Sequence, residues 1–169
     1  MRAWIASALL ATLPMAAGAV ELIGETMPPY PSGLRDVGGS CLSESADPAH
    51  VCDFSIGLLG AADADPGIET PPLYVVAGRM AGRDGPLALW KITDAQAYPK
   101  VGKGYYWQAG SCRVDKVDDG KVIAVVQQSS DQEYLTDVAW ARRLDLATGK
   151  FSVVEPKRVD CINEGYGEP

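Results

Sequence analysis

The chain has 169 residues, with 22 acidic residues, 15 basic residues and a single histidine, so its formal net charge is −7. Such a surface repels phosphate backbones and anionic headgroups, which makes nucleic acids and membrane surfaces poor partners. Basic proteins or cationic ligands fit this charge better, and the length suits one domain with a substantial core.

The first 19 residues have the pattern of a secretory signal peptide. A basic start at Arg2 precedes the apolar run Ala3–Leu13, and the small residues Ala17-Gly18-Ala19 form a cleavage site, so we expect cleavage after Ala19. The apolar run is too short to span a bilayer, which needs roughly 20 residues. Without Arg2 the chain has 14 basic against 22 acidic residues, a charge of −8. We expect a periplasmic or secreted protein with no membrane insertion.

Four cysteines in an exported chain predict two disulfides, and four cysteines allow three pairings. Cys41 and Cys52 bracket a short polar segment, which favours that pair and leaves Cys112 with Cys161. The spacing is not that of a zinc site, and the lone His50 cannot complete a mixed set of ligands. We therefore expect no metal and no cofactor.

The mature chain begins with a segment rich in proline and glycine, residues 20–51. Three prolines within M-P-P-Y-P forbid a helix and remove donors from a sheet. We interpret residues 20–51 as an extended arm and loop, followed by a β domain at 52–161 and a flexible tail at 162–169.

Alternation over Cys52–Leu59 predicts a half-buried strand. An acidic loop follows, and its carboxylates Asp63, Asp65 and Glu69 do not match the spacing of a calcium loop. We interpret them as solvated groups that a partner could contact.

The turn signal A-G-R-D-G between residues 73–80 and 86–92 predicts a hairpin. Residues 93–98 then predict one helical turn, with Thr93 as its cap and Pro99 as its end.

Residues 105–161 alternate between apolar and polar side chains and predict a run of antiparallel strands, the first of them Y-Y-W-Q-A-G-S-C-R-V-D. Tyr105, Tyr106 and Trp107 open this run. Exposed rings beside lysines would suit a protein partner or a sugar. We favour the other interpretation, in which Tyr105 and Trp107 are core and Tyr106 is a cross-strand neighbour.

Asp119-Gly120 predicts a second hairpin turn, and Val122–Val126 predicts a central strand buried on both faces. Residues 131–147 fit either a strand or a helix, because Ser130 and Glu133 resemble a capping box. The alternation of large apolar residues favours the strand.

No catalytic motif stands out. The chain has no G-x-S-x-G elbow and no glycine-rich phosphate loop, and oxidised cysteines cannot act as nucleophiles. We therefore expect a mostly β protein, a single antiparallel sandwich or barrel-like meander with at most one or two short helices, stapled by two disulfides. Its expected function is binding, inhibition or immunity through contact with a protein, for which a basic protein fits the charge best, rather than catalysis. A carboxylate-dependent carbohydrate hydrolase and a small-ligand carrier are the alternatives.

Overall fold

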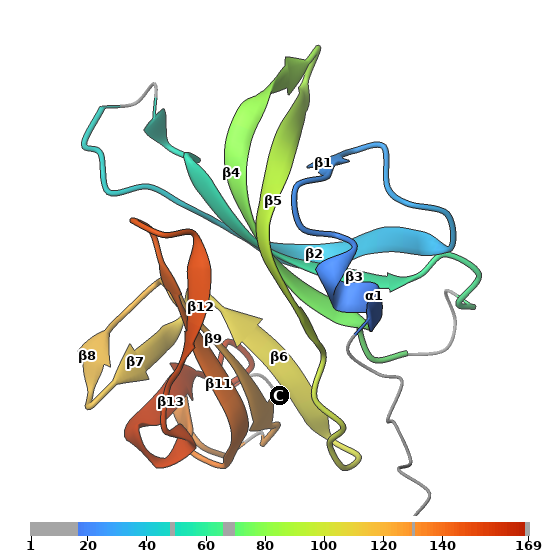
Figure 1. The fold of residues 1–169 in the computed structure, drawn as a ribbon. Helices are drawn as coiled ribbons and strands as arrows, with labels where there is room; N and C mark the ends of the chain where they lie inside the picture. Colours follow the sequence, from blue (N-terminus) through green and yellow to red (C-terminus); the bar gives the residue numbers. More distant parts are fainter. Residues whose placement is uncertain (1–16, 48–49, 66–69, 130, 168–169) are drawn as a thin grey trace, which may run out of the picture.

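The computed structural model describes residues 17–47, 50–65, 70–129 and 131–167. Most of the predicted signal peptide, as well as Glu69 and Ser130, lies outside these residues. The described chain is mostly antiparallel strand, with a four-residue helix α1 (Ala17–Val20) and a 3-10 turn η2 (Pro156–Arg158). The prediction of a mostly β fold is confirmed (Figure 1). Within the described residues no helix has the length and apolar character to cross a membrane.

Three antiparallel sheets organise these strands. Sheet A has the order β1 (Thr26–Met27), β5 (Leu87–Ala97), β4 (Tyr74–Asp84), β3 (Phe54–Ala61), β2 (Leu34–Leu42). Sheet B has the order β12 (Lys150–Val153), β11 (Val138–Asp145), β9 (Val122–Gln127), β6 (Tyr105–Ala109). Sheet C has the order β10 (Tyr134–Leu135), β13 (Val159–Ile162), β7 (Cys112–Val114), β8 (Val117–Asp118).

Sheet B is the middle layer, and its central strand β9 is buried on both faces as predicted. Val122, Ala124 and Val126 pack in one apolar cluster with residues of sheet C, whereas Ile123 packs with residues of sheet A. Burying one such aliphatic side chain stabilises the fold by about 1.5–3 kcal/mol. Figure 1 shows sheet A at the upper right and sheets B and C at the lower left.

Both predicted disulfides are present, and all four cysteines are paired. Cys112 and Cys161 are directly opposite one another on β7 and β13, and both are buried. Cys41–Cys52 joins β2 to the loop before β3, and Cys41 is exposed. The pairing of all four cysteines indicates an oxidising environment.

The interpretation of residues 20–51 as arm and loop is wrong over Leu34–Leu42. This segment is strand β2, which pairs along its length with β3. A bulge between Asp36 and Gly38 lets the glycine-rich stretch follow the sheet, since Gly38 and Gly39 take positive φ angles of 139° and 152°.

The predicted helical turn at residues 93–98 is also wrong, because β5 continues through it to Ala97. Backbone pairing with β4 prevails over the local capping signal, with Asp94 opposite Ala77 and Ala97 opposite Tyr74. The hairpin of β4 and β5 is confirmed, but its strands extend further toward the turn than predicted.

Two details of the C-terminal half differ from the prediction. The stretch predicted as one strand breaks at Gly110, whose φ is 88°, so that β6 lies in sheet B and β7 in sheet C. The hairpin β7–β8 turns at Asp115-Lys116, both with positive φ, whereas Asp119-Gly120 links β8 of sheet C to β9 of sheet B.

The strand interpretation of residues 131–147 is confirmed by β10 and β11. The tail begins as an ordered part of the fold: Ile162 ends β13, and the buried Asn163 amide donates to the carbonyl oxygens of Ser129 and Gln132 (2.6 and 2.7 Å). The predicted loose end therefore starts later than expected.

Candidate functional site

The outer face of sheet A, the face turned away from sheet B, has a hollow where two glycines meet. Gly39 of β2 pairs directly with Gly57 of β3, and Val76 of β4 pairs with Gly57. Side chains of a strand alternate between faces, so a glycine pair leaves an unfilled area on one face. A Cβ at Gly39 would collide with the carbonyl oxygen of Ile56, so only glycine fits there.

This hollow is a cavity of about 260 Å³ that polar and apolar residues line. Its lining combines apolar side chains with a few polar ones and with glycine backbone: Met27, Tyr30, Asp36, Gly38, Gly39, Ser40, Cys41, Ser55, Ile56, Gly57, Leu59, Val76, Trp90 and Ile92. Met27 belongs to β1, and Tyr30 follows it on the N-terminal segment. The cavity thus lies between sheet A and the N-terminal segment.

Asp36 and Tyr30 supply one polar end of the cavity, and the hydroxyls of Ser40 and Ser55 also line it. The Tyr30 hydroxyl donates to Asp36 Oδ2 (3.4 Å), and the backbone N–H of Gly38 donates to Asp36 Oδ1 (2.9 Å). Burial raises the pKa of the Tyr30 hydroxyl, and the neighbouring Asp36 carboxylate raises it further. Tyr30 therefore stays protonated and can donate. Among the lining residues that the structure describes, Asp36 is the only charged side chain.

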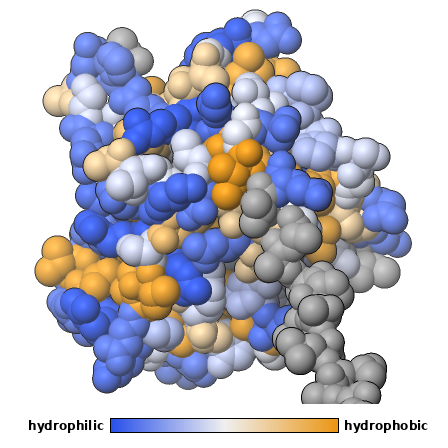
Figure 2. Space-filling model, viewed as in Figure 1, coloured by the Kyte–Doolittle hydropathy of each residue, from blue (hydrophilic) through white to orange (hydrophobic). Residues whose placement is uncertain are grey.

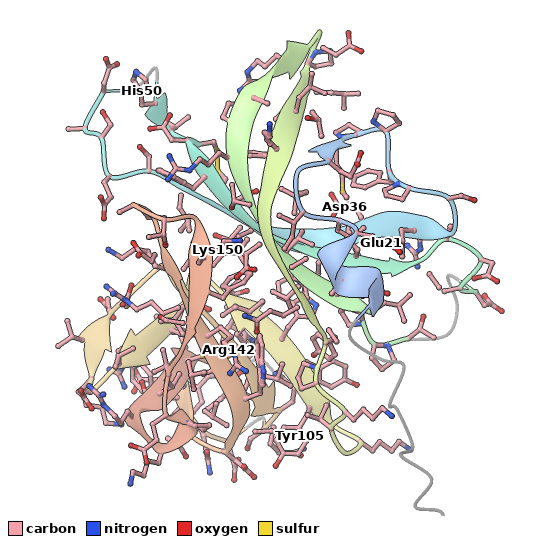
Figure 3. All side chains as sticks on the ribbon, in the orientation of Figure 1. Glu21, Asp36, His50, Tyr105, Arg142 and Lys150 are labelled. Carbon is pink, nitrogen blue, oxygen red and sulfur yellow. A yellow bond between two sulfur atoms is a disulfide. The ribbon has the colours of Figure 1, made fainter. Side chains whose placement is uncertain are left out.

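A second cavity of about 630 Å³ adjoins the first, and Tyr30 lines both. Its lining includes Glu21 and Glu25 and, among the described residues, no lysine or arginine. Gly18 also lines it and belongs to the segment that the predicted cleavage removes. Figure 3 places Glu21 and Asp36 on the side of the view where α1 lies.

The structure does not bring the predicted partner-binding residues together. Asp63 and Asp65 are exposed beyond the end of β3, and Glu69 lies outside the described residues. The loop of Asp63 is at the right in Figure 1, whereas the labelled Tyr105 lies at the lower edge of Figure 3. Neither acid lines either of the two cavities.

The three aromatic residues of β6 have different surroundings. Trp107 packs against the apolar cluster between sheets A and B, where Gly38 leaves room for its ring. The Tyr105 hydroxyl donates to Asp137 Oδ1 (3.0 Å), and this hydrogen bond raises its pKa. Tyr106 points the other way and is 36% exposed. Of the triplet, Tyr106 is thus the ring most available to a partner.

His50 and Asp53 form a pair, but Ser43, the described serine that contacts it, does not complete a catalytic triad. His50 Nδ1 lies 2.9 Å from Asp53 Oδ1, as in a Ser-His-Asp site. However, the Ser43 hydroxyl donates to Asp53 Oδ2 (3.2 Å) rather than to the histidine ring, so the base is not engaged with this serine. Within the described ranges, no group of three or more His, Cys, Asp or Glu side chains is arranged to hold a metal ion.

Most of the surface in Figure 2 is hydrophilic, with an apolar strip at the left, where Figure 1 shows β7 and β8. Val117 of β8 is 69% exposed. Val117 lines neither of the two cavities described above.

No protein-family model, no curated protein and no solved structure matches this chain. The sequence prediction missed Tyr30, Asp36 and Gly39 because it treated residues 20–51 as an arm and loop, and it placed Gly57 in a strand without assigning it a role. Glycines at Gly39 and Gly57 within otherwise strand-like stretches were the available signal, since glycine inside a strand often marks a close approach or a bulge.

Proposed function

We propose that this protein is an exported, non-catalytic binding protein that holds a small molecule in the hollow on the outer face of sheet A. The observation that carries the proposal is the cavity of about 260 Å³ above the Gly39–Gly57 pair. Ligand sites in proteins are concave and mostly apolar, with a few placed polar groups. Tyr30, Asp36 and Ser55 provide such groups here, and Trp90 and Ile92 provide apolar walls.

The chemistry of the cavity supports binding over hydrolysis. Glycoside hydrolysis uses two carboxyl groups that flank the scissile bond. One carboxylate, Asp36, lines the described part of this cavity, where Tyr30 and the Gly38 N–H engage it, whereas Glu21 and Glu25 line the adjoining cavity. The signal-like leader and the two disulfides support action in the periplasm or outside the cell.

The test is a thermal-unfolding screen of small molecules against the purified, oxidised protein. A ligand that binds only the folded state at 100 times its Kd stabilises it by about 2.7 kcal/mol. Hits should stabilise the natural protein and lose most of this effect in Gly57→Ala, in which a methyl group enters the hollow. Gly102→Ala is the control, because a Cβ there lies 3.9 Å from its nearest neighbour, Tyr105, and outside the cavity. A screen without hits, or hits that bind Gly57→Ala equally well, would contradict the proposal.

A second candidate is contact with a protein partner through the edge of sheet B. Strand β6 is an edge strand of that sheet and carries the partly exposed Tyr106. Edge strands and tyrosines both favour protein association. Capture from a periplasmic extract at low and high salt tests it. The natural protein should retain a basic partner at low salt and release it at high salt. The Tyr106→Ser variant should retain less of that partner at low salt. Absent or salt-insensitive capture would count against this candidate.

A further inference from the structure

We infer that the ligand of the hollow is an organic cation, a molecule with an apolar body and one ammonium group. This inference rests on the proposed function and goes beyond it by assigning the charge and shape of the ligand. The ammonium group would lie at the Asp36–Tyr30 end, and the apolar body would lie over the Gly39–Gly57 pair between Met27, Trp90 and Ile92.

The carboxylate of Asp36 favours a positive charge on the ligand. It is the one charged group on the described lining of the cavity, and no lysine or arginine there could neutralise it or bind an anion. Its Oδ1 accepts from the Gly38 N–H and its Oδ2 from the Tyr30 hydroxyl. Each carboxylate oxygen has more than one lone pair, so Asp36 can accept a further hydrogen bond from an ammonium group.

The lining of the adjoining cavity also favours a positively charged ligand. Glu21 and Glu25 line that cavity, Tyr30 lines both cavities, and within the described part of the chain no basic side chain lines this second cavity either. The face therefore combines three carboxylates with the rings of Tyr30 and Trp90, and these carboxylates outnumber the single α-ammonium that cleavage after Ala19 would leave on Val20, next to Glu21. Aromatic rings attract cations through the negative charge on their faces. The negative net charge, −7 for the full chain and −8 without Arg2, adds a long-range attraction for cations.

The apolar part of the hollow sets the shape. Without side chains at Gly39 and Gly57, the floor is backbone and the walls are Met27, Val76 and Ile92. These aliphatic groups offer no partner to a second polar group on the ligand, and Ser40 and Ser55 add only two hydroxyls to the described lining. A chain or ring of a few carbons fits there better than a sugar, whose hydroxyls all require hydrogen bonds.

The test compares three probes that share one apolar chain: n-hexylammonium, hexan-1-ol and hexanoate, titrated calorimetrically into the oxidised protein at pH 7. We expect hexylammonium to bind best, hexanol to bind about fivefold more weakly and hexanoate to bind weakest. The factor is about five because an exposed ion pair contributes at most about that much to affinity. Asp36→Asn keeps the oxygen that accepts from Gly38 and should reduce hexylammonium affinity about fivefold, with hexanol unchanged. Asp63→Asn makes the same charge change outside both cavities and should change neither affinity.

The outcomes separate this inference from the function on which it rests. If hexanol or hexanoate binds as tightly as hexylammonium, or if Asp63→Asn weakens the cation as much as Asp36→Asn does, the cation preference is wrong while binding in the hollow survives. If none of the three probes binds, both are contradicted for ligands of this size. The probe series on the natural protein decides the matter even where Asp36→Asn fails to fold.

Discussion

Gly39 of β2 lies directly opposite Gly57 of β3, and Val76 continues the row on β4. This single cross-strand pair explains why the outer face of sheet A is concave. On most sheets the residues in such a row would bring their Cβ atoms within about 5 Å of one another and fill the surface. Here the space is left open beneath Met27 and Tyr30.

The two glycines should respond differently to the same substitution. Gly39 has a φ of 152° and no room for a Cβ, so Gly39→Ala should lower the free energy of unfolding by about 1–3 kcal/mol. At Gly57 a Cβ would lie 3.2 Å from Val76 Cγ2, and a small shift of that methyl group accommodates it. Gly57→Ala should therefore change stability by less than about 1 kcal/mol. Urea denaturation of both variants checks this, and equal losses would contradict the assignment of the hollow to Gly57.

Asp160 forms a buried ionic pair beside the Cys112–Cys161 bridge. It is 2% exposed, accepts from Arg113 Nε (2.6 Å) and pairs with Lys116. The Arg113 guanidinium also stacks over the ring of Tyr134, 3.4 Å from its centroid. Burial opposes ionisation of Asp160, but the hydrogen bonds from Arg113 and Lys116 outweigh it, so its pKa lies below the ordinary value.

A lowered pKa in the folded state stabilises the protein above the unfolded pKa, near 4, and this stabilisation is lost as the pH falls through the folded pKa. Asp160→Asn should thus cost about 2 kcal/mol at pH 7, because it removes hydrogen bonds to charged groups. The difference from the natural protein should shrink at pH 3. Urea denaturation at the two pH values measures it. A difference that stays constant down to pH 3 would show that the carboxylate charge is not what stabilises this site.

The two disulfides should differ in both accessibility and stabilisation. Cys112–Cys161 is buried and closes 49 residues, whereas Cys41–Cys52 has an exposed cysteine and closes 11. Chain-entropy arguments assign about 4 kcal/mol to the longer loop and about 3 kcal/mol to the shorter. Under mild reductant, two thiols should appear while the protein remains folded, and peptide mapping should locate them at Cys41 and Cys52. Simultaneous release of all four thiols would contradict this order.

Thr93 and Asp94 fasten sheet A to the β11–β12 hairpin. The Thr93 hydroxyl donates to the Gly149 carbonyl (2.8 Å), and the Asp94 carboxylate accepts from the Phe151 N–H (2.8 Å). Asp94→Ala leaves that N–H without its acceptor and should cost about 1–2 kcal/mol. Hydrogen exchange of the Phe151 amide should accelerate in Asp94→Ala. Asp84→Ala, at the far end of β4, is the control and should leave this amide protected. Equal acceleration in both variants would contradict the role of the Asp94–Phe151 hydrogen bond in joining sheet A to the hairpin.

Alternation and cysteine spacing were sufficient to predict the β class, the buried strand Val122–Val126 and both disulfides. Those features depend on the two-residue alternation of apolar side chains and on the strand face that each cysteine takes, and both are visible in the sequence. The failures have a common cause. Thr93–Tyr98 has a local helix signal, yet β4 and the Gly149–Phe151 turn supply its hydrogen-bond partners from far along the chain.

The candidate site was missed for the same reason. Gly39 and Gly57 matter only because β2 and β3 pair in one particular register, and composition suggested a loop for the first of them. Tyr30 and Asp36 become neighbours only once the proline-rich segment folds over sheet A. In contrast, Asp63, Asp65 and the aromatic triplet were conspicuous in sequence but do not converge on one cavity.

The central claim is that a small molecule binds in the hollow above the Gly39–Gly57 pair. Chemical-shift mapping of the 15N-labelled, oxidised protein with a stabilising ligand tests it most directly. The largest amide shifts should occur at Gly38, Gly39 and Gly57, with smaller ones at the acidic loop of Asp63 and at β6. Saturable shifts confined to that loop or to β6, with the glycine amides unmoved, would contradict it.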